Sequence, residues 1–315
     1  MKITVFEAES VCGEDLNLEA LREFGTVSFE PTPDPSLVAE RIGDSEVLIC
    51  SKVRVTEEIL SACPNLRYVG LTATGYNNVD LEACRRHGVI VTNIPCYSTD
   101  AVCQMTVAFL LQFATNLIRY EASTRRGDWT RSPIFCYYPY AMTELAGKTL
   151  GLFGLGSIGQ RVAEVASALG MKVIYHCRTP KDLPYEFVSR KELFCRSDFL
   201  SLHCPLSAET ENLICRETLS LMKPEAFLIN TARGGLIREE DLAEALEAGR
   251  IAGFAADVLK TEPQREDCPL IGVKNCILTP HVAWAPYETR VRLIGILLDN
   301  LASWQKGILK NVVNP

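Results

Sequence analysis

The chain has 315 residues, of which 47% are hydrophobic and 23% are charged, and its formal net charge is −7. This length suits two domains better than one core, and the composition is that of an ordinary soluble globular protein. The acidic balance argues against a general nucleic-acid binder, because such a protein needs a basic face to neutralise phosphates.

The thirteen cysteines include no pair with the spacing C-x-x-C. Neither a zinc ribbon nor a redox dithiol is indicated, and we expect no metal site. Most of the cysteines lie in apolar runs, which predicts buried free thiols and a reducing compartment. The N-terminus enters a strand pattern without a signal-peptide core, and no apolar run approaches the ~20 residues that span a bilayer. We therefore expect a cytoplasmic protein with no membrane partner.

In the first part of the chain, short apolar runs alternate with helical patterns, which is typical of parallel sheets built from βαβ units. The strands expected there include residues 2–6, 46–50, 66–71 and 88–93. A long helix is expected from Thr99 to Arg125, and its apolar residues lie almost all round. Such a helix is expected to be buried between domains or subunits.

The second part begins at residue 148 and predicts six strands of a doubly wound sheet. They cover residues 148–154, 172–177, 198–204, 226–230, 253–258 and 275–280. An amphipathic helix follows over residues 286–307, and we expect it to return to the first domain. The predicted fold class is α/β, with two doubly wound parallel-sheet domains. Their expected bounds are 1–98 plus 287–315, and 99–286.

A glycine fingerprint, "GLFGLGSIG", follows the first strand of the second set and opens a helix. Gly154 permits a tight turn, Gly156 lets the backbone approach a pyrophosphate, and Gly159 allows close packing of helix on strand. The amides at the start of the helix suit the phosphates. This context predicts a dinucleotide site.

The stretch "VIYHCRTPK" lies where such a fingerprint normally meets an acidic residue that holds the adenosine ribose. Cys177 stands there instead and is followed by Arg178 and Thr179. An arginine at this turn is able to pair with a 2′-phosphate. We therefore favour NADP(H) as the cofactor. The alternative is that these are ordinary solvated turn residues, in which case NAD(H) remains possible.

Several chemistry-bearing residues follow the carboxyl ends of predicted strands, where open α/β sheets bind ligands. His281 is the strongest candidate among the four histidines, and His203 is the second. Arg233 suits bidentate binding of a carboxylate or phosphate. As an isolated residue, Glu262 is typical of an ordinary loop acid. Together, Arg233, Glu262 and His281 are a set that is able to bind a 2-oxo acid and move a proton.

The segments "GLFGLGSIG", "HCPLSAET", "NTARGGLI", "GFAADVLKTEP" and "TPHVAW" together resemble those of the D-isomer-specific 2-hydroxyacid dehydrogenases, over nearly the whole chain. "ATGYNNVDL" and "TPHVAWAPYETR" are most similar to the glycerate dehydrogenase/hydroxypyruvate reductase branch. The resemblance implies a Rossmann dinucleotide-binding domain and a discontinuous flavodoxin-like substrate domain. It also implies a homodimer built around residues 99–145.

The resemblance further implies roles for individual residues. Arg233 matches the arginine that orients the substrate, His281 the general acid/base, and Glu262 the acid paired with it. The substrate contacts expected are Thr74, Gly75, Arg233 and Trp284. The cofactor contacts expected are Thr106, Gly154, Gly156, Ser157, Ile158, Gly159, Arg178, Thr179, Cys204, Pro205, Thr210, Thr231, Ala232, Asp257, His281 and Ala283.

The expected activity is therefore hydride transfer between a nicotinamide cofactor and a small 2-oxo or D-2-hydroxy acid, with hydroxypyruvate or glyoxylate favoured. Other specificities of the family, of the D-lactate or 3-phosphoglycerate type, are alternatives. A non-catalytic dinucleotide sensor of the corepressor kind is another. A formate dehydrogenase-like enzyme is disfavoured, because that branch pairs its histidine with glutamine where this chain has Glu262.

Overall fold

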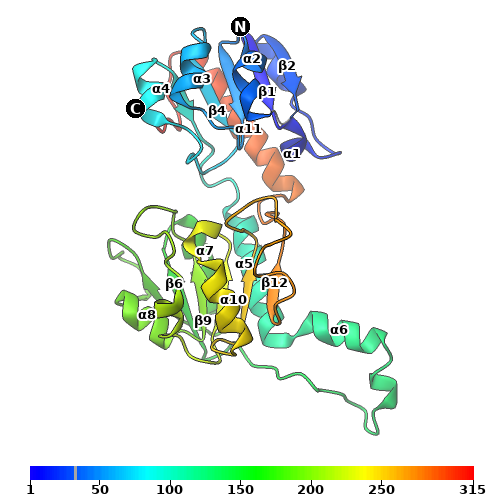
Figure 1. The fold of residues 1–315 in the computed structure, drawn as a ribbon. Helices are drawn as coiled ribbons and strands as arrows, with labels where there is room; N and C mark the ends of the chain where they lie inside the picture. The colour runs from blue at the N-terminus through cyan, green and yellow to red at the C-terminus, as the bar shows by residue number, and fades with distance from the viewer. Residues whose placement is uncertain (32–33) are drawn as a thin grey trace. The chain divides into compact units, whose positions relative to one another are not determined.

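The structure is a computed structural model, and it describes residues 1–31 and 34–315. The chain divides into two compact units. One comprises Met1–Ser98 with Ala285–Pro315, and the other comprises Thr99–Trp284 (Figure 1). Each unit is built on its own parallel sheet, which confirms the predicted α/β fold class.

The sheet of the first unit has the strand order β2-β1-β3-β4-β5, the order of flavodoxin-like folds. Its strands are β1 (Lys2–Phe6), β2 (Thr26–Glu30), β3 (Val47–Cys50), β4 (Tyr68–Leu71) and β5 (Ile90–Thr92). All side chains of β3 and β4 are buried, as is typical of central parallel strands. At the edge, β2 buries only Val27 completely, so its apolar pattern is weak.

Helices surround this sheet, and the last helix of the chain belongs to the same unit. They are α1 (Ala8–Cys12), η1 (Glu19–Phe24), η2 (Pro35–Leu37), α2 (Val38–Ile42), α3 (Glu57–Ala62), α4 (Leu81–Arg86) and α11 (Tyr287–Gln305). α11 packs on β4 through buried leucines such as Leu297. The C-terminal tail is tied to β5, because the Asn314 side chain accepts from the Val91 amide at 2.8 Å and donates to the Val89 carbonyl at 2.8 Å.

The sheet of the second unit has seven parallel strands in the order β12-β11-β10-β9-β6-β7-β8. They are β6 (Thr149–Phe153), β7 (Lys172–His176), β8 (Glu186–Phe187), β9 (Phe199–Leu202), β10 (Phe227–Asn230), β11 (Gly253–Ala256) and β12 (Cys276–Leu278). The prediction of six strands was wrong by one. β8 has only two residues, both exposed, so it gives no apolar run.

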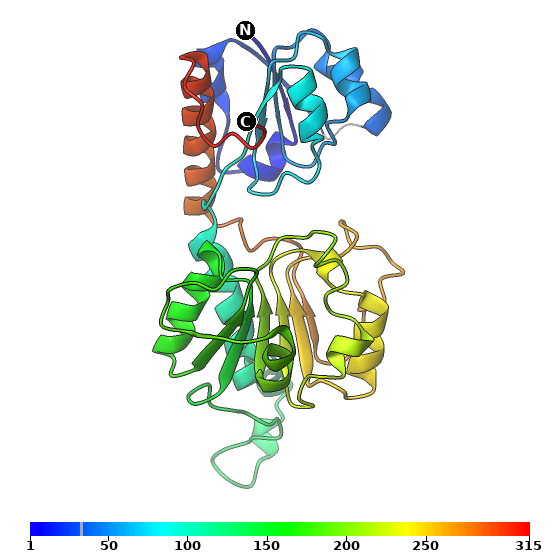
Figure 2. The ribbon, with the colours of Figure 1, turned by 90° about the vertical axis from the view of Figure 1, so that its left-hand side faces the viewer.

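Helices cover both faces of this sheet (Figure 2). The helices of this unit are α5 (Thr99–Thr115), α6 (Leu117–Arg125), η3 (Trp129–Arg131), α7 (Ser157–Ala168), α8 (Arg190–Arg196), α9 (Arg216–Leu219), η4 (Gly234–Leu236) and α10 (Glu239–Glu247). Of these, α6 and the segment that follows it extend away from the sheet (Figure 1). β9 shows how the strands serve both faces, since Phe199 joins one apolar core while Leu200 and Leu202 join the other. β6 lies between β9 and β7, which makes the carboxyl ends of β6 and β9 the switch point where such folds bind ligands.

The single helix expected over residues 99–125 is two helices in the structure. Asn116 interrupts it with a left-handed φ of 53°, and its side-chain amide donates to the Ala141 carbonyl at 2.6 Å. α5 and α6 meet at a bend of 59°, and α5 packs on α7 and β10 of its own unit. Within residues 1–31 and 34–315, no single helix is long and apolar enough to cross a membrane, and only this bent pair meets that test when counted together.

Candidate active site

The glycine loop between β6 and α7 contains glycines of two kinds. Gly154 has a φ of +100°, and a Cβ there would lie 2.4 Å from the His203 carbonyl oxygen. A Cβ on Gly159 would lie 2.6 Å from the Gly154 oxygen, so both positions are fixed by the packing of the fold. Gly156 has an ordinary φ of −73° and open space where its Cβ would stand. Its lack of a side chain therefore leaves room for a molecule from outside the fold.

This open space lies at the start of the twelve-residue helix α7. Gly156 is the N-cap and has no side chain to accept from the first amides of the helix, while Ser157 beside it is exposed. Amides at a helix start, together with the helix dipole, favour an anionic group such as a pyrophosphate. The predicted residues Gly154, Gly156, Ser157, Ile158 and Gly159 thus fit a dinucleotide.

The turn after β7 carries the residues predicted to meet the adenosine end. The Cys177 thiol donates to the Thr179 carbonyl at 2.9 Å, which closes the turn locally. Arg178 and Thr179 are exposed. In the part of the chain that the structure describes, no hydrogen bond or ion pair involves the Arg178 guanidinium. The turn therefore offers a cation that the protein itself does not neutralise.

His203, the second histidine candidate, is a structural residue here. Its Nε2 lies 2.9 Å from the Ser201 hydroxyl, and its carbonyl oxygen lies against Gly154. Burial lowers the pKa of His203 to about 4, so the ring is neutral at pH 7. A neutral imidazole has no extra proton to give. The structure thus disfavours His203 as the acid of the reaction.

The other predicted cofactor residues lie on loops that follow β9 and β10 or face them. Thr210 closes the loop after β9 by donating to the Pro205 carbonyl at 2.7 Å. Cys204, the residue before Pro205, is buried. Thr106 on α5 is fully buried, and its hydroxyl lies 3.0 Å from that of Thr231 after β10. These residues surround the carboxyl edge of the sheet.

Arg233 follows β10, and its loop is shaped by a residue that the sequence did not reveal as important. Asn230 is fully buried, and its side chain donates to the Arg233 carbonyl at 2.9 Å and accepts from the Ala232 amide at 3.0 Å. The half-buried Arg233 guanidinium donates to the Ala232 carbonyl at 2.7 Å. An asparagine that ends a strand is the only signal that could have pointed to this clamp.

His281 follows β12 and forms the predicted pair with Glu262. His281 Nδ1 lies 2.7 Å from Glu262 Oε2, and the two side chains are 26% and 31% exposed. The other carboxylate oxygen, Oε1, accepts from the Leu259 amide at 3.0 Å. The backbone of His281 has a left-handed φ of 55°, a conformation that is costly for a residue with a side chain and is frequent at functional sites.

Asp257 holds the His281 loop in this conformation. It is 1% exposed, and its carboxylate accepts from the Thr279 hydroxyl at 2.6 Å and from the amides of Val282 and Ala283 at 2.9 and 2.8 Å. These contacts give Asp257 a positioning role that the sequence did not suggest. Acceptance by backbone amides is invisible in a sequence, because any residue supplies the donor.

Thr74 and Gly75, the predicted substrate contacts, belong to the first unit and follow β4. The Thr74 hydroxyl donates to the Ile94 carbonyl at 2.8 Å, and its own carbonyl accepts from the Asn93 side chain at 2.7 Å. Trp284 is half-buried and ends the second unit, three residues beyond His281.

An open parallel sheet with a glycine-lined helix start at its switch point defines a dinucleotide-binding α/β protein. The family model described as D-isomer specific 2-hydroxyacid dehydrogenase, NAD binding domain, matches residues 107–283. The chain belongs to the D-isomer-specific 2-hydroxyacid dehydrogenases, a family of oxidoreductases.

Relatives and solved structures cover nearly all of the chain. It is 40% identical to a hydroxypyruvate reductase of Blautia hydrogenotrophica, with 100% of both chains covered, and 38% identical to a glycerate dehydrogenase of Methylorubrum extorquens, with 90% of both covered. The TT0316 protein of Thermus thermophilus has a TM-score of 0.89 at 36% identity and covers 99% of this chain and 100% of its own. An NADPH-dependent glyoxylate/hydroxypyruvate reductase of Sinorhizobium meliloti, in complex with NADP and malonate, has a TM-score of 0.87 at 30% identity, with coverage of 99% and 96%.

Proposed function

We propose that the protein reduces a small 2-oxo acid, hydroxypyruvate or glyoxylate, to the D-2-hydroxy acid. The observation that carries this proposal is the contact of 2.7 Å between His281 Nδ1 and Glu262 Oε2 at the carboxyl edge of a dinucleotide-type sheet. Relatives named hydroxypyruvate reductase, glycerate dehydrogenase and glyoxylate reductase support the choice of substrate.

The nicotinamide cofactor, when bound, supplies the hydride that adds to the carbonyl carbon. The carbonyl oxygen then becomes an alkoxide, which needs one proton to give the alcohol. His281 is the proton donor: Glu262 holds Nδ1, while Nε2 has no partner in the described ranges and is left for proton exchange.

Arg233 binds the substrate in this proposal. Its guanidinium is able to pair with the 2-oxo acid carboxylate and to stabilise charge that develops on the carbonyl oxygen. The Asn230 clamp fixes the backbone from which the guanidinium projects. We also propose Thr74 and Gly75 as substrate contacts, which makes the unit of Met1–Ser98 with Ala285–Pro315 the substrate domain and Thr99–Trp284 the cofactor domain.

We infer that NADP(H) is the preferred cofactor. The exposed Arg178, which has no hydrogen-bond or ion-pair partner among the described residues, suits a 2′-phosphate, and Cys177 lacks the negative charge that would repel one. Two structural relatives were solved with NADPH or NADP.

Thirteen free thiols fit a reducing, cytoplasmic compartment.

We also infer a homodimer. The segment 117–142 extends away from the sheet of its own unit (Figure 1) and exposes large apolar side chains, including Leu117 at 67%, Phe135 at 90% and Tyr138 at 69%. A largely apolar hollow of about 1010 Å³ lies beside the α5–α6 junction, lined by Phe113, Met142 and others. Exposed apolar area of this kind is typical of an interface with another chain.

Initial rates with a panel of 2-oxo acids, each with NADPH and NADH, test the proposed activity. We expect hydroxypyruvate and glyoxylate to give the highest kcat/KM, and NADPH to be preferred. No turnover with any 2-oxo acid would contradict the proposal and favour a dinucleotide sensor instead.

A further inference from the structure

Glu239 is a buried acid with no part in the chemistry proposed above. It is 8% exposed and is the first residue of α10. A carboxylate at the start of a helix gains from the helix dipole, but an exposed side chain would gain this equally. Burial of a charge is costly unless the group is well hydrogen-bonded, so the contacts of Glu239 need an explanation.

Those contacts lead to the loop that carries Glu262. Glu239 Oε1 accepts from the backbone amide of Lys260 at 2.7 Å. The same stretch of backbone is pressed against the Arg233 loop, because a Cβ on Gly234 would lie 1.9 Å from the Leu259 carbonyl carbon and 2.3 Å from the Lys260 nitrogen. The two loops therefore meet at the Leu259–Lys260 peptide, and Glu239 holds them together.

The amide next to this junction holds the proposed catalytic acid. The Leu259 amide donates to Glu262 Oε1 at 3.0 Å, while Glu262 Oε2 lies 2.7 Å from His281 Nδ1. Two consecutive amides thus have separate acceptors, one in Glu239 and one in Glu262. A shift of this peptide would move the Leu259 donor and turn the Glu262 carboxylate away from the imidazole.

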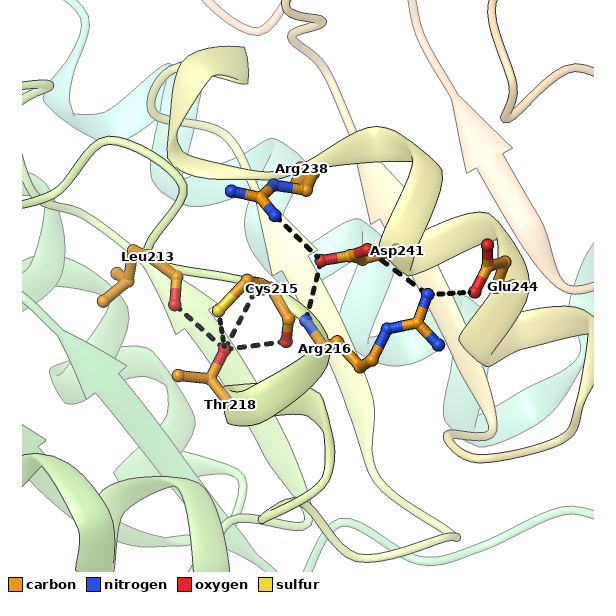
Figure 3. A network of polar contacts seen from close by, with 7 residues as sticks. All are labelled: Leu213, Cys215, Arg216, Thr218, Arg238, Asp241 and Glu244. Atoms are coloured by element: carbon orange, nitrogen blue, oxygen red, sulfur yellow. Dashed lines mark hydrogen bonds and ion pairs between the residues drawn. The ribbon is translucent and has the colours of Figure 1, made fainter.

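The helix that carries Glu239 is itself anchored. Arg216, the first residue of α9, makes two contacts with α10 (Figure 3). Its backbone amide donates to Asp241 Oδ2 at 2.9 Å, and its guanidinium pairs with Glu244 Oε2 at 2.5 Å. Arg238, the residue before Glu239, lies 3.8 Å from Asp241. Figure 3 shows Asp241 and Glu244, on the first two turns of α10, bonded to Arg216 at the start of α9. Glu239 therefore projects from an element that is fixed independently of the active-site loops.

We propose that Glu239 is a positioning residue for the Glu262–His281 pair, acting through the Leu259–Lys260 peptide. The inference rests on the proposed function, because its consequence is measured as the rate of 2-oxo acid reduction. The role requires a hydrogen-bond acceptor for the Lys260 amide, at the length of a glutamate side chain. The negative charge of Glu239 is of secondary importance.

Three substitutions at this position separate reach from charge. Glu239→Ala removes the acceptor, Glu239→Asp keeps the charge but shortens the side chain, and Glu239→Gln keeps an acceptor at the same reach. We expect kcat to fall about tenfold or more in the Ala and Asp variants, because small misplacements of catalytic groups are costly. The KM for the cofactor should change less than about twofold, and Gln should restore kcat to within about threefold of the wild type.

Glu240→Ala is the matched control, since Glu240 is the next residue, is exposed and carries the same charge. It should leave kcat and KM unchanged. Wild-type kcat in the Asp variant would overturn the proposal, and so would a Gln variant as slow as Asp. Melting temperatures of all variants are measured, and the folded Asp and Gln variants decide the question if Ala does not fold.

Whether Glu239 acts on the rate through Glu262, the route proposed above, is tested in a Glu262→Gln background. There, Glu239→Asp should change kcat by less than about twofold, because residues that act as a unit are not additive. Fully additive losses would overturn the route. His281→Ala is assayed in parallel. No 2-oxo acid turnover by the wild type would refute the proposed function, and normal turnover in His281→Ala would refute the role of His281. Loss of turnover in His281→Ala, with normal kcat in the Glu239 variants, would refute only the role of Glu239.

Discussion

Gly154, Gly156 and Gly159 share a motif but differ in what requires them. Backbone contacts of 2.4 and 2.6 Å to a Cβ explain Gly154 and Gly159 within the fold itself. A Cβ on Gly156 would meet open space, which leaves its backbone accessible to a ligand. The fold itself therefore requires two of the three glycines, and the third keeps the start of α7 open.

Arg178 carries the proposed preference for NADP(H). Arg178→Ala should raise the KM for NADPH about tenfold or more and leave the KM for NADH nearly unchanged, because only NADPH has a 2′-phosphate to pair with. Steady-state kinetics with both cofactors measure this. Arg190→Ala, at another exposed arginine of the same unit, is the control. Equal effects of Arg178→Ala on the two cofactors would contradict the phosphate role.

His203 predicts a pH dependence of stability. Burial lowers the pKa of His203 to about 4, whereas in the unfolded chain the pKa is about 6.5. As pH falls from 6.5 to 4, the unfolded state binds a proton that the folded state does not, so stability is lost over this window. Urea unfolding between pH 7 and 4 should show a shallower pH dependence for His203→Gln than for the wild type. Identical slopes would argue against a buried neutral ring.

The residues of the glycine loop and the Arg233, Glu262 and His281 set could be proposed from the sequence, because their types and their places after strands carry the signal. Asn230, Asp257 and Glu239 could not be assigned their roles, because each acts on backbone amides or carbonyls of its own or another loop. A sequence shows the acceptor but not which amide will face it.

At the scale of elements, the strands with fully buried side chains were the most predictable. β6 and β9 are buried and mostly apolar, with the sequences TLGLF and FLSL. β8 was missed, because two exposed residues give no run, and the α5–α6 helix was predicted without its break. That break depends on Asn116, whose side-chain amide donates a hydrogen bond to the Ala141 carbonyl, 25 residues further along the chain. A local sequence pattern therefore does not predict the break.

Glu7 joins two loops of the first unit and gives a prediction at this scale. It is 8% exposed, has a φ of 62°, and accepts from the amides of Ser51 and Lys52 after β3 at 2.8 and 2.7 Å. Glu7→Ala should lower the free energy of unfolding by about 2–3 kcal/mol, because two amides lose their acceptor. Urea unfolding followed by circular dichroism checks this. Glu9→Ala, at an exposed position nearby, should have no effect, and an equal loss there would contradict the explanation.

At the scale of the whole molecule, the exposed segment 117–142 predicts self-association. Phe135→Asp should shift the mass in solution from that of two chains toward that of one, because a charge at a 90% exposed aromatic position would be buried in the dimer. Multi-angle light scattering after size exclusion measures the mass. A wild-type protein that already runs as a monomer would contradict the dimer, and Glu247→Ala, at an exposed position of α10 outside segment 117–142, serves as the control.

The central claim is that His281, held by Glu262, donates the proton during reduction of a 2-oxo acid. The most direct test is the initial rate of hydroxypyruvate reduction by His281→Ala at saturating NADPH, beside the wild type. We expect kcat to fall about 10²–10⁴-fold, with the cofactor still bound, because the alkoxide loses its proton donor. A His281→Ala variant with near-normal kcat would contradict the claim.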